Sequence, residues 1–246
     1  MRSIEIQWAG ERLILLPEKV LAWPRTASLI VADLHFGKPA AFRMSGIPVP
    51  ESTTVSDLDR LDELLAEHRS QRLIILGDFF HSAAGLQPEM MEAVADWCRK
   101  KAPLEIVLIP GNHDKKSGEP PACWNIQNVP DGWNLAPFSF CHEPKNIAGS
   151  HVLAGHIHPA IALREKYGSG MRVPCFWFSQ TCAVLPAFGS FTGTHSIRPS
   201  RGDRVFAVGH SEIIEITTVV RGTRTGVPTL LAKKKPIRDE PRGGLG

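Results

Sequence analysis

Three short apolar runs in the first half of the chain each end in polar residues. They are residues 27–35 (ASLIVADLH), 72–80 (RLIILGDFF) and 104–114 (LEIVLIPGNHD), and their lengths are typical of buried strands. Residues 52–70 carry leucines at helical spacing, and residues 88–101 have acidic residues early and basic residues late, as helices prefer. The order strand, helix, strand, helix, strand predicts an α/β fold with a parallel sheet.

The remaining segments predict strands and loops but no further helix. Residues 4–23 form short apolar runs around a turn and predict an opening pair of strands. Gly and Pro in residues 36–51 (FGKPAAFRMSGIPVPE) predict a loop. Later strands are predicted within residues 133–144, 151–159, 173–188 and 204–220. We expect one domain over residues 1–221, followed by a flexible basic tail over residues 222–246.

Composition agrees with a folded protein of ordinary polarity. The chain has 246 residues, of which 43% are apolar and 22% charged, enough for one large domain with its own core. Its net charge is +3, but seven Lys or Arg and two Asp or Glu lie from residue 221 onward, so the positive charge belongs to the tail. That tail is either a nucleic-acid-binding arm or a solubilising terminus.

Neither a membrane nor an oxidising compartment is indicated. No apolar run reaches the roughly 18–20 residues of a membrane span, and the first residues lack the pattern of a secretory signal. The five cysteines are scattered, with no Cys-x-x-Cys pair, so we expect reduced thiols. The cytoplasm is the expected location.

Two histidines one residue apart, His156 and His158, follow the apolar run 151–155. Residues two apart on a strand share a face, so the two rings are expected to point into one volume, and Asp33 and His35 have the same spacing. The other strand ends add Asp78, Asn112, His113, Asp114 and His142. One such residue alone is usually a cap or a satisfied polar group, but this many at separate strand ends predict a metal centre. Carboxylate, imidazole and amide ligands without thiolates suit Mn, Fe or Zn.

The motifs D-x-H, G-D, G-N-H-D, a later His and G-H-x-H occur here as DLH, GD, GNHD, CHE and GHIH between residues 33 and 158. In this order they resemble the calcineurin-like metallophosphoesterase superfamily. The longer stretches DLHFGKPAAFRMSGIPVPE, GDFFHS, CHEP, GHIHP and LPAFGSFTG look closer to the ligase-associated DNA-damage-response phosphoesterases, the PdeM family. The resemblance covers the chain up to about residue 216, and the tail has no part in it.

The resemblance implies a four-layer α/β sandwich with a two-metal site at strand ends. One metal would take Asp33, His35 and His158, the other would take Asn112, His142 and His156, and Asp78 would bridge both. We expect two divalent ions, with Mn²⁺ favoured and Fe or Zn as alternatives. Every ligand position of the pattern is filled, which favours an active enzyme over a scaffold that keeps only the fold.

His113 is the candidate that protonates the leaving oxygen, and Asp114 is expected to orient its imidazole. Lys38, Arg43 and His81 are candidates for holding the substrate, although a lone Lys or Arg is usually only solvated and His81 could instead support the ligands. Residues 190–203 (SFTGTHSIRPSRGD), with His195 and Arg198, form either a specificity rim or an ordinary hairpin loop. Trp177, in a strand, is expected in the core rather than as a platform for a base.

The leading function is a metal-dependent phosphodiesterase or nuclease acting on nucleic acid or cyclic nucleotides. The expectation of a nucleic-acid substrate and of a role in DNA repair comes from the resemblance, not from the residue spacing. The alternatives are a phosphomonoesterase and a nucleotide-sugar pyrophosphohydrolase of lipid synthesis, because the same dinuclear core serves all three. Expected partners are a phosphodiester substrate such as single-stranded DNA and, by function, a DNA ligase and other repair enzymes. The sequence indicates no oligomeric state.

Overall fold

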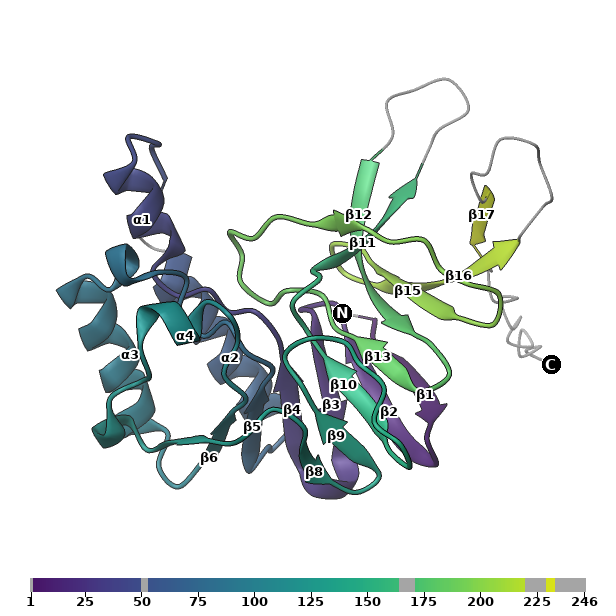
Figure 1. Ribbon diagram of the computed structural model, residues 1–246, viewed down its shortest axis with the longest axis horizontal. Helices are drawn as coiled ribbons and strands as arrows, with labels where there is room; N and C mark the ends of the chain where they lie inside the picture. Colours follow the sequence, from purple (N-terminus) through teal and green to yellow (C-terminus); the bar gives the residue numbers. More distant parts are fainter. Residues whose placement is uncertain (1, 50–52, 164–170, 220–228, 233–246) are drawn as a thin grey trace, which may run out of the picture.

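The computed structural model describes residues 2–49, 53–163, 171–219 and 229–232, and at residues 163, 217–219 and 229–232 it describes the backbone alone. Two β-sheets pack face to face, and the helices cover the outer side of one of them (Figure 1). No helix in these ranges is both long and apolar enough to cross a bilayer.

The first sheet has seven strands that lie side by side in chain order. They are β1 (Ile4–Trp8), β2 (Glu11–Leu16), β3 (Val20–Trp23), β4 (Ser28–Val31), β5 (Arg72–Ile75), β6 (Glu105–Leu108) and β7 (Ile126–Asn128). Strands β1 to β4 pair antiparallel, and β4 to β7 pair parallel. The predicted parallel core and the opening strands are confirmed.

Four α-helices accompany this sheet: α1 (Lys38–Met44), α2 (Thr53–Glu67), α3 (Pro88–Lys100) and α4 (Asp114–Ser117). Short 3-10 helices lie at Pro24–Thr26, Ala83–Gly85 and Ala122–Trp124. The prediction of an unbroken loop over residues 36–51 is wrong, because α1 lies within it. Gly37 adopts a left-handed φ of 81° at the start of α1, and Pro39 in the first turn starts a helix rather than breaking it.

The second sheet has the order β17-β16-β15-β12-β13-β10-β9-β8, with β11 and β14 joined beside β12. Its strands are β8 (Trp133–Leu135), β9 (Phe138–Phe140), β10 (His151–Ala154), β11 (Pro159–Leu163), β12 (Met171–Phe178), β13 (Cys182–Val184), β14 (His195–Ser196), β15 (Arg204–Val208), β16 (Ile213–Val219) and β17 (Thr229–Ala232). Strand β10 pairs parallel with both β9 and β13. The strand-rich second half is confirmed.

Alternate residues of the first sheet build two separate cores. Leu29 and Val31 of β4 pack against the leucines of α2, whereas Ile30 and Ala32 face the second sheet. The α/β sandwich is therefore confirmed. In the described ranges α-helices cover one sheet only, so the fourth, helical layer that the resemblance implies is not among them. The described residues after residue 130 form strands and loops but no helix.

The tail boundary at residue 222 is only partly consistent with the structure. Strand β17 pairs antiparallel with β16, with Ile216 opposite Ala232 and Val219 opposite Thr229. Four residues of the segment predicted as tail therefore add an edge strand to the second sheet. Residues 220–228 and 233–246 lie outside the described residues, so the rest of that prediction stays a prediction.

Candidate metal centre

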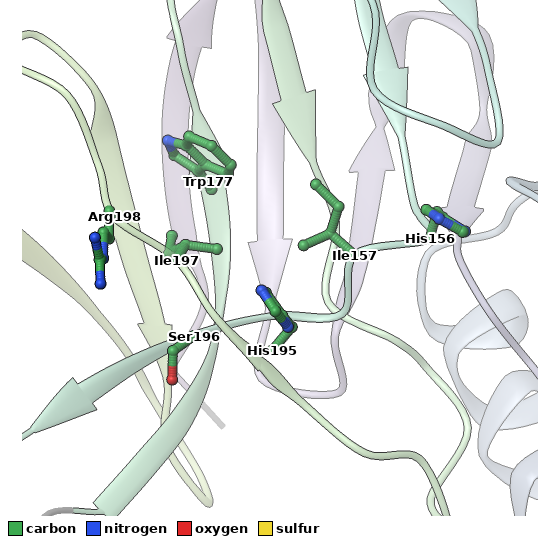
Figure 2. A pocket seen from close by; sticks show the side chains of 7 residues that line it. All are labelled: His156, Ile157, Trp177, His195, Ser196, Ile197 and Arg198. Carbon is green, nitrogen blue, oxygen red and sulfur yellow. The ribbon is translucent and has the colours of Figure 1, made fainter.

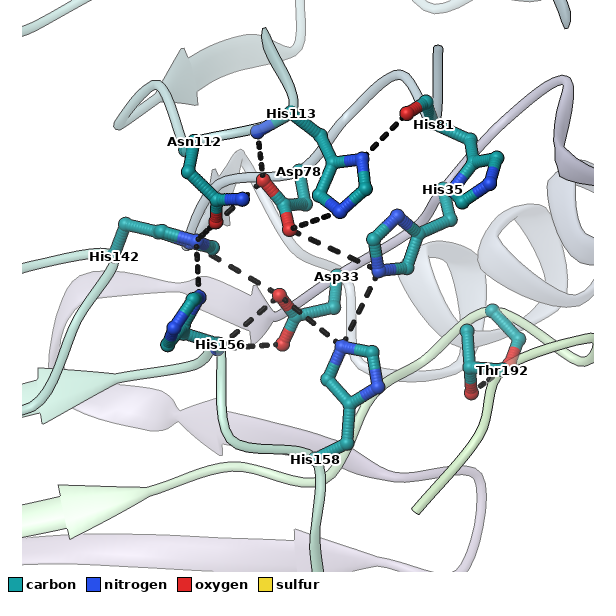
Figure 3. A network of polar contacts seen from close by, with 12 residues as sticks. Asp33, His35, Asp78, His81, Asn112, His113, His142, His156, His158 and Thr192 are labelled. Atoms are coloured by element: carbon teal, nitrogen blue, oxygen red, sulfur yellow. Dashed lines mark hydrogen bonds and ion pairs between the residues drawn. The ribbon is translucent and has the colours of Figure 1, made fainter. Parts of the chain in front are cut away.

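The polar residues at the strand ends meet at one place, where both sheets contribute loops (Figure 3). The first sheet supplies Asp33 and His35 after β4, Asp78 after β5, and Asn112 and His113 after β6. The second sheet supplies His142 after β9, and His156 and His158 after β10. All seven side chains predicted as metal ligands lie in this group, as does His113.

The prediction that these paired residues share one face of a strand is wrong, because they lie in loops beyond the ends of their strands. Left-handed backbone is adopted by Asp33 (φ 55°), His35 (50°), Asp78 (49°), His156 (69°) and His158 (50°). Such angles are uncommon for residues other than Gly, although Asn, Asp and His adopt them more often than the rest, and they cluster at functional sites. Tight loops, not strand pleating, therefore aim these side chains.

The first ligand cluster contains Asp33, His35 and His158, whose ligand atoms lie within 4.8 Å of one another. His158 Nε2 is 3.2 Å from His35 Nε2 and 3.6 Å from Asp33 Oδ1. Asp33 and His35 are buried, and His158 is partly exposed. The backbone N–H of His156 donates to both Asp33 oxygens, at 3.1 and 2.9 Å, and so fixes this carboxylate.

The second ligand cluster contains Asp78, His142 and His156, again within 4.8 Å. His142 Nε2 lies 2.9 Å from Asn112 Oδ1, 3.0 Å from His156 Nδ1 and 3.5 Å from Asp78 Oδ1. His156 is exposed and forms the open side of this cluster. His156 and His158 therefore belong to different clusters, as the resemblance implies.

Asp78 lies between the two clusters. Its Oδ1 is 3.5 Å from His142 Nε2 in the second cluster, and its Oδ2 is 3.8 Å from His35 Nε2 in the first. Burial raises the pKa of Asp78, and the nearby His142 and the backbone N–H of His113 only partly offset this. A carboxylate in this position fits a bridge between two cations.

The ring nitrogens show which atoms are available as ligands. His142 Nδ1 lies 2.9 Å from the carbonyl oxygen of Leu76, and His158 Nδ1 lies 3.0 Å from that of Gly193. Because a carbonyl oxygen only accepts, each Nδ1 carries the proton and each Nε2 presents a lone pair to its cluster. Lone pairs and carboxylates that face one another at these distances offer a binding site for a cation.

The lowered pKa of His35 also supports a cation site at the first cluster. Burial, followed by the charges of His158 and Lys38, lowers its pKa to about 2, so its ring is neutral at ordinary pH. The pKa of His158 is raised, because the hydrogen bond and charge of Asp33 outweigh the opposing effect of burial. A neutral His35 imidazole beside two buried carboxylates suits a divalent metal site.

Close backbone packing holds the second cluster together. A Cβ at Gly77 would overlap the His142 ring, and one at Gly111 would overlap the Asp78 carboxylate. Gly77 also has a φ of 79°. Gly77 therefore permits a close approach of His142 to the backbone beside Asp78, and Gly111 has the same role.

His113 lies at the mouth of the centre with its side chain about one-third exposed. Its Nδ1 donates to the carbonyl oxygen of His81 at 2.5 Å, and its Nε2 is 4.0 Å from Asp78 Oδ2. The His81 ring stacks on it, with centroids 5.0 Å apart. Nε2 is therefore the nitrogen that can exchange a proton with a substrate.

Asp114 does not orient His113, and that prediction is wrong. This buried carboxylate accepts hydrogen bonds from the backbone N–H groups of Phe79 (3.2 Å), Phe80 (2.9 Å) and Gly111 (2.9 Å). These donors follow Asp78 and precede Asn112, so Asp114 ties together the two loops that carry ligands. His113 is instead oriented by the backbone carbonyl of His81. The sequence could not reveal this partner, because every residue has a backbone carbonyl.

Of the three candidates for substrate binding, Lys38 and His81 lie near the centre. Lys38 is partly buried, and its charge acts on His35, His81 and Asp78. Burial lowers the pKa of Lys38 and lowers that of His81 to about 4. Arg43 instead donates to the Val49 carbonyl and lines a separate pocket between α1 and α3.

The sequence analysis missed a supporting network beneath the first cluster. Asp57 on α2 accepts the backbone N–H and hydroxyl of Ser190, and Arg60 donates to the carbonyl of Phe188 at 2.6 Å. The segment fixed in this way continues to Gly193, whose carbonyl holds His158. A signal was present, because Asp57 lies on the same helix face as Leu61 and Leu64, where a carboxylate is unusual.

The chain is similar to proteins of known family and structure. The family model of the calcineurin-like phosphoesterases matches residues 28–214. The solved nuclease MPE from Pseudomonas putida is 40% identical, with a TM-score of 0.76 over 85% of this chain and 98% of that chain. The phosphoesterase YfcE from E. coli is 15% identical, with a TM-score of 0.36 over 83% of this chain and 98% of that chain. No curated protein matches the chain. The family match spans every candidate ligand from Asp33 to His158.

Proposed function

The chain belongs to the calcineurin-like phosphoesterase family, and from this premise we propose that it is a dinuclear metal-dependent phosphodiesterase that cleaves nucleic acid. The observation that carries the proposal is Asp78, whose two oxygens face two different clusters of nitrogen and oxygen ligands. Asp33, His35 and His158 would hold one cation, and Asn112, His142 and His156 the other. Mn²⁺ is the first ion to test.

Two bound divalent ions would supply Lewis acidity toward a phosphoryl oxygen and ionise a water near neutral pH. The charge balance of the protein fits this use. The imidazoles are neutral ligands, so Asp33 and Asp78 offset only part of the charge of two dications. The centre would therefore stay cationic and attract a phosphate diester.

His113 is placed to complete the reaction at the leaving oxygen. Its Nδ1–H is committed to the His81 carbonyl, so a proton can leave only from Nε2 of the charged imidazolium. Stacking against His81 keeps the ring edge toward the centre. Lys38, on the same side, adds a positive charge that would hold a phosphate oxygen.

Nucleic acid is favoured as the substrate by two observations. The Pseudomonas putida neighbour at 40% identity is a nuclease, and His156 leaves one side of the centre exposed, as a polymeric substrate requires. A role in DNA repair beside a DNA ligase rests on the resemblance of the sequence motifs and is part of the same proposal.

A small substrate panel tests the activity. The protein loaded with Mn²⁺ would be given a phosphodiester, a phosphomonoester, a nucleoside 2′,3′-cyclic phosphate and single-stranded DNA. We expect turnover of the diesters and of DNA to exceed that of the monoester. Preferential hydrolysis of the monoester would overturn the phosphodiesterase assignment.

Elemental analysis tests the metal centre separately. We expect two metal ions per chain in the wild type and fewer in both His156→Ala and His158→Ala, because each removes a ligand from a different cluster. Arg201→Gln, in an exposed turn, is the control and should keep both ions. Full metal content in both histidine variants would refute the ligand assignment.

A further inference from the structure

A pocket of about 490 Å³ opens beside the second ligand cluster. Its lining includes His156, Trp177, His195 and Arg198 (Figure 2). The volume lies within the range of small-ligand sites, roughly 300–1,000 Å³. Because His156 belongs to both the pocket and the cluster, a molecule in the pocket would lie next to the phosphate held at the centre.

The pocket wall is fixed to the metal centre by the backbone. The N–H of His195 donates to the carbonyl of His158 at 2.9 Å, and β14 pairs parallel with β11. The ring of His158 in turn binds the Gly193 carbonyl. The segment from Gly193 to Arg198 therefore cannot shift without moving a candidate ligand, which gives the pocket a set distance from the reaction.

From its strand, Trp177 was expected to lie in the core. It also forms an ordered aromatic wall of the pocket. It is half-buried, and its indole N–H donates to Asp203 Oδ2 at 2.8 Å. The same oxygen accepts the backbone N–H of Ser200 at 2.8 Å, which fixes the turn that follows Arg198. Asp203 thus holds the indole and the turn in one arrangement.

The charge of the pocket is positive. Arg198 and His195 are exposed, and within the described chain no hydrogen bond or ion pair occupies the Arg198 guanidinium. None of the lining residues is acidic. A fixed aromatic ring beside an available guanidinium is the arrangement that binds a base and a phosphate of a single strand.

We propose that this pocket is a nucleotide subsite, in which Trp177 stacks on the base next to the scissile phosphate and Arg198 pairs with the following phosphate of a single-stranded nucleic acid. The proposal rests on the phosphodiesterase function and assigns its polymer preference to these residues. A small diester has no second phosphate or neighbouring base, so its hydrolysis would not use the pocket.

Kinetics of the Mn²⁺-loaded full chain on two substrates test the subsite. Arg198→Gln should raise KM for a single-stranded oligonucleotide about tenfold, leave kcat unchanged, and leave hydrolysis of bis(p-nitrophenyl) phosphate unchanged. Trp177→Leu should weaken oligonucleotide binding roughly 5- to 150-fold, the range for loss of one base stack. Arg201→Gln, in the same loop but outside the pocket lining, is the matched control and should match the wild type on both substrates.

Binding gives a readout that does not depend on turnover. Fluorescence anisotropy of a labelled, hydrolysis-resistant phosphorothioate oligothymidylate, measured with the metal-loaded full chain across a salt series, should show a slope smaller by about 0.7 in Arg198→Gln, the value for one phosphate contact on a single strand. If the wild type cleaves DNA and Arg198→Gln keeps the wild-type KM and salt slope, the subsite is overturned and the proposed function still stands. Equal losses on both substrates in Arg198→Gln would also overturn it. A wild-type enzyme that hydrolyses neither substrate would instead overturn the proposed function.

Discussion

Asp114→Asn tests whether this carboxylate positions the ligand loops or takes part in the chemistry. Asp114 Oδ2 accepts the N–H groups of Phe79 and Gly111, and Oδ1 accepts that of Phe80. Asparagine has nearly the same shape but only one accepting oxygen. In its better orientation the amide oxygen keeps two of these bonds, and the amide N–H₂ group faces the remaining backbone donor.

The cost follows from those contacts. One hydrogen bond to a charged acceptor is lost and one buried N–H is left without a partner, which lowers the free energy of unfolding by about 2–4 kcal/mol. The loops that carry Asp78 and Asn112 would loosen, so metal affinity should fall by about 10- to 100-fold, as for other supporting groups of metal sites. Urea unfolding of the metal-free protein and calorimetric titration with Mn²⁺ measure the two effects.

Asp62→Asn is the matched control. Asp62 accepts the Trp97 indole N–H between α2 and α3 and pairs with Lys101, so its loss should lower stability while leaving metal affinity as in the wild type. The reasoning would be refuted if Asp114→Asn kept wild-type stability and metal affinity but lost kcat. That result would return Asp114 to the role of orienting His113.

Three further outcomes are expected. His113→Ala should keep both metals but lose about 10²–10⁴-fold in kcat on a diester with a poor leaving group, with a smaller loss for nitrophenolate; equal losses would remove His113 from the acid role. Gly111→Ala should abolish metal binding in a titration, because its Cβ would overlap the Asp78 carboxylate, whereas Gly193→Ala enters open space and should not. In the metal-free protein, the His35 pKa of about 2 lies below the unfolded value of about 6.5. The folded state therefore binds fewer protons at this group, and the contribution of His35 to stability should fall by about 1.6 kcal/mol from pH 6.5 to pH 5; urea midpoints that have the same pH dependence in His35→Gln as in the wild type would contradict this.

The sequence predicts the composition of the centre better than its geometry. The seven candidate ligands follow from polar residues at strand ends, because the carboxyl ends of parallel strands meet at one edge. The left-handed loops could not be predicted from alternation, since a pattern of period two describes only extended strands. The role of Asp114 and the partner of His113 depend on backbone N–H and C=O groups, which every residue has. Trp177 was predicted to be a core residue because a strand pattern does not show where a neighbouring loop leaves a pocket.

The distribution of ligands between the sheets indicates how folding and metal binding are coupled. In the first cluster Asp33 and His35 come from the first sheet and His158 from the second, and in the second cluster Asp78 faces His142 and His156 across the same seam. Each bound ion would therefore cross-link the two sheets that the inter-sheet core holds together. The third nearby group, His35, His81 and His113, comes from the first sheet alone. A cation there would not join the two sheets, so this group lacks the cross-link that the other two clusters offer. Because five residues of the two cross-linking clusters have left-handed backbone, metal binding would offset both the strain of these loops and the repulsion of the buried carboxylates.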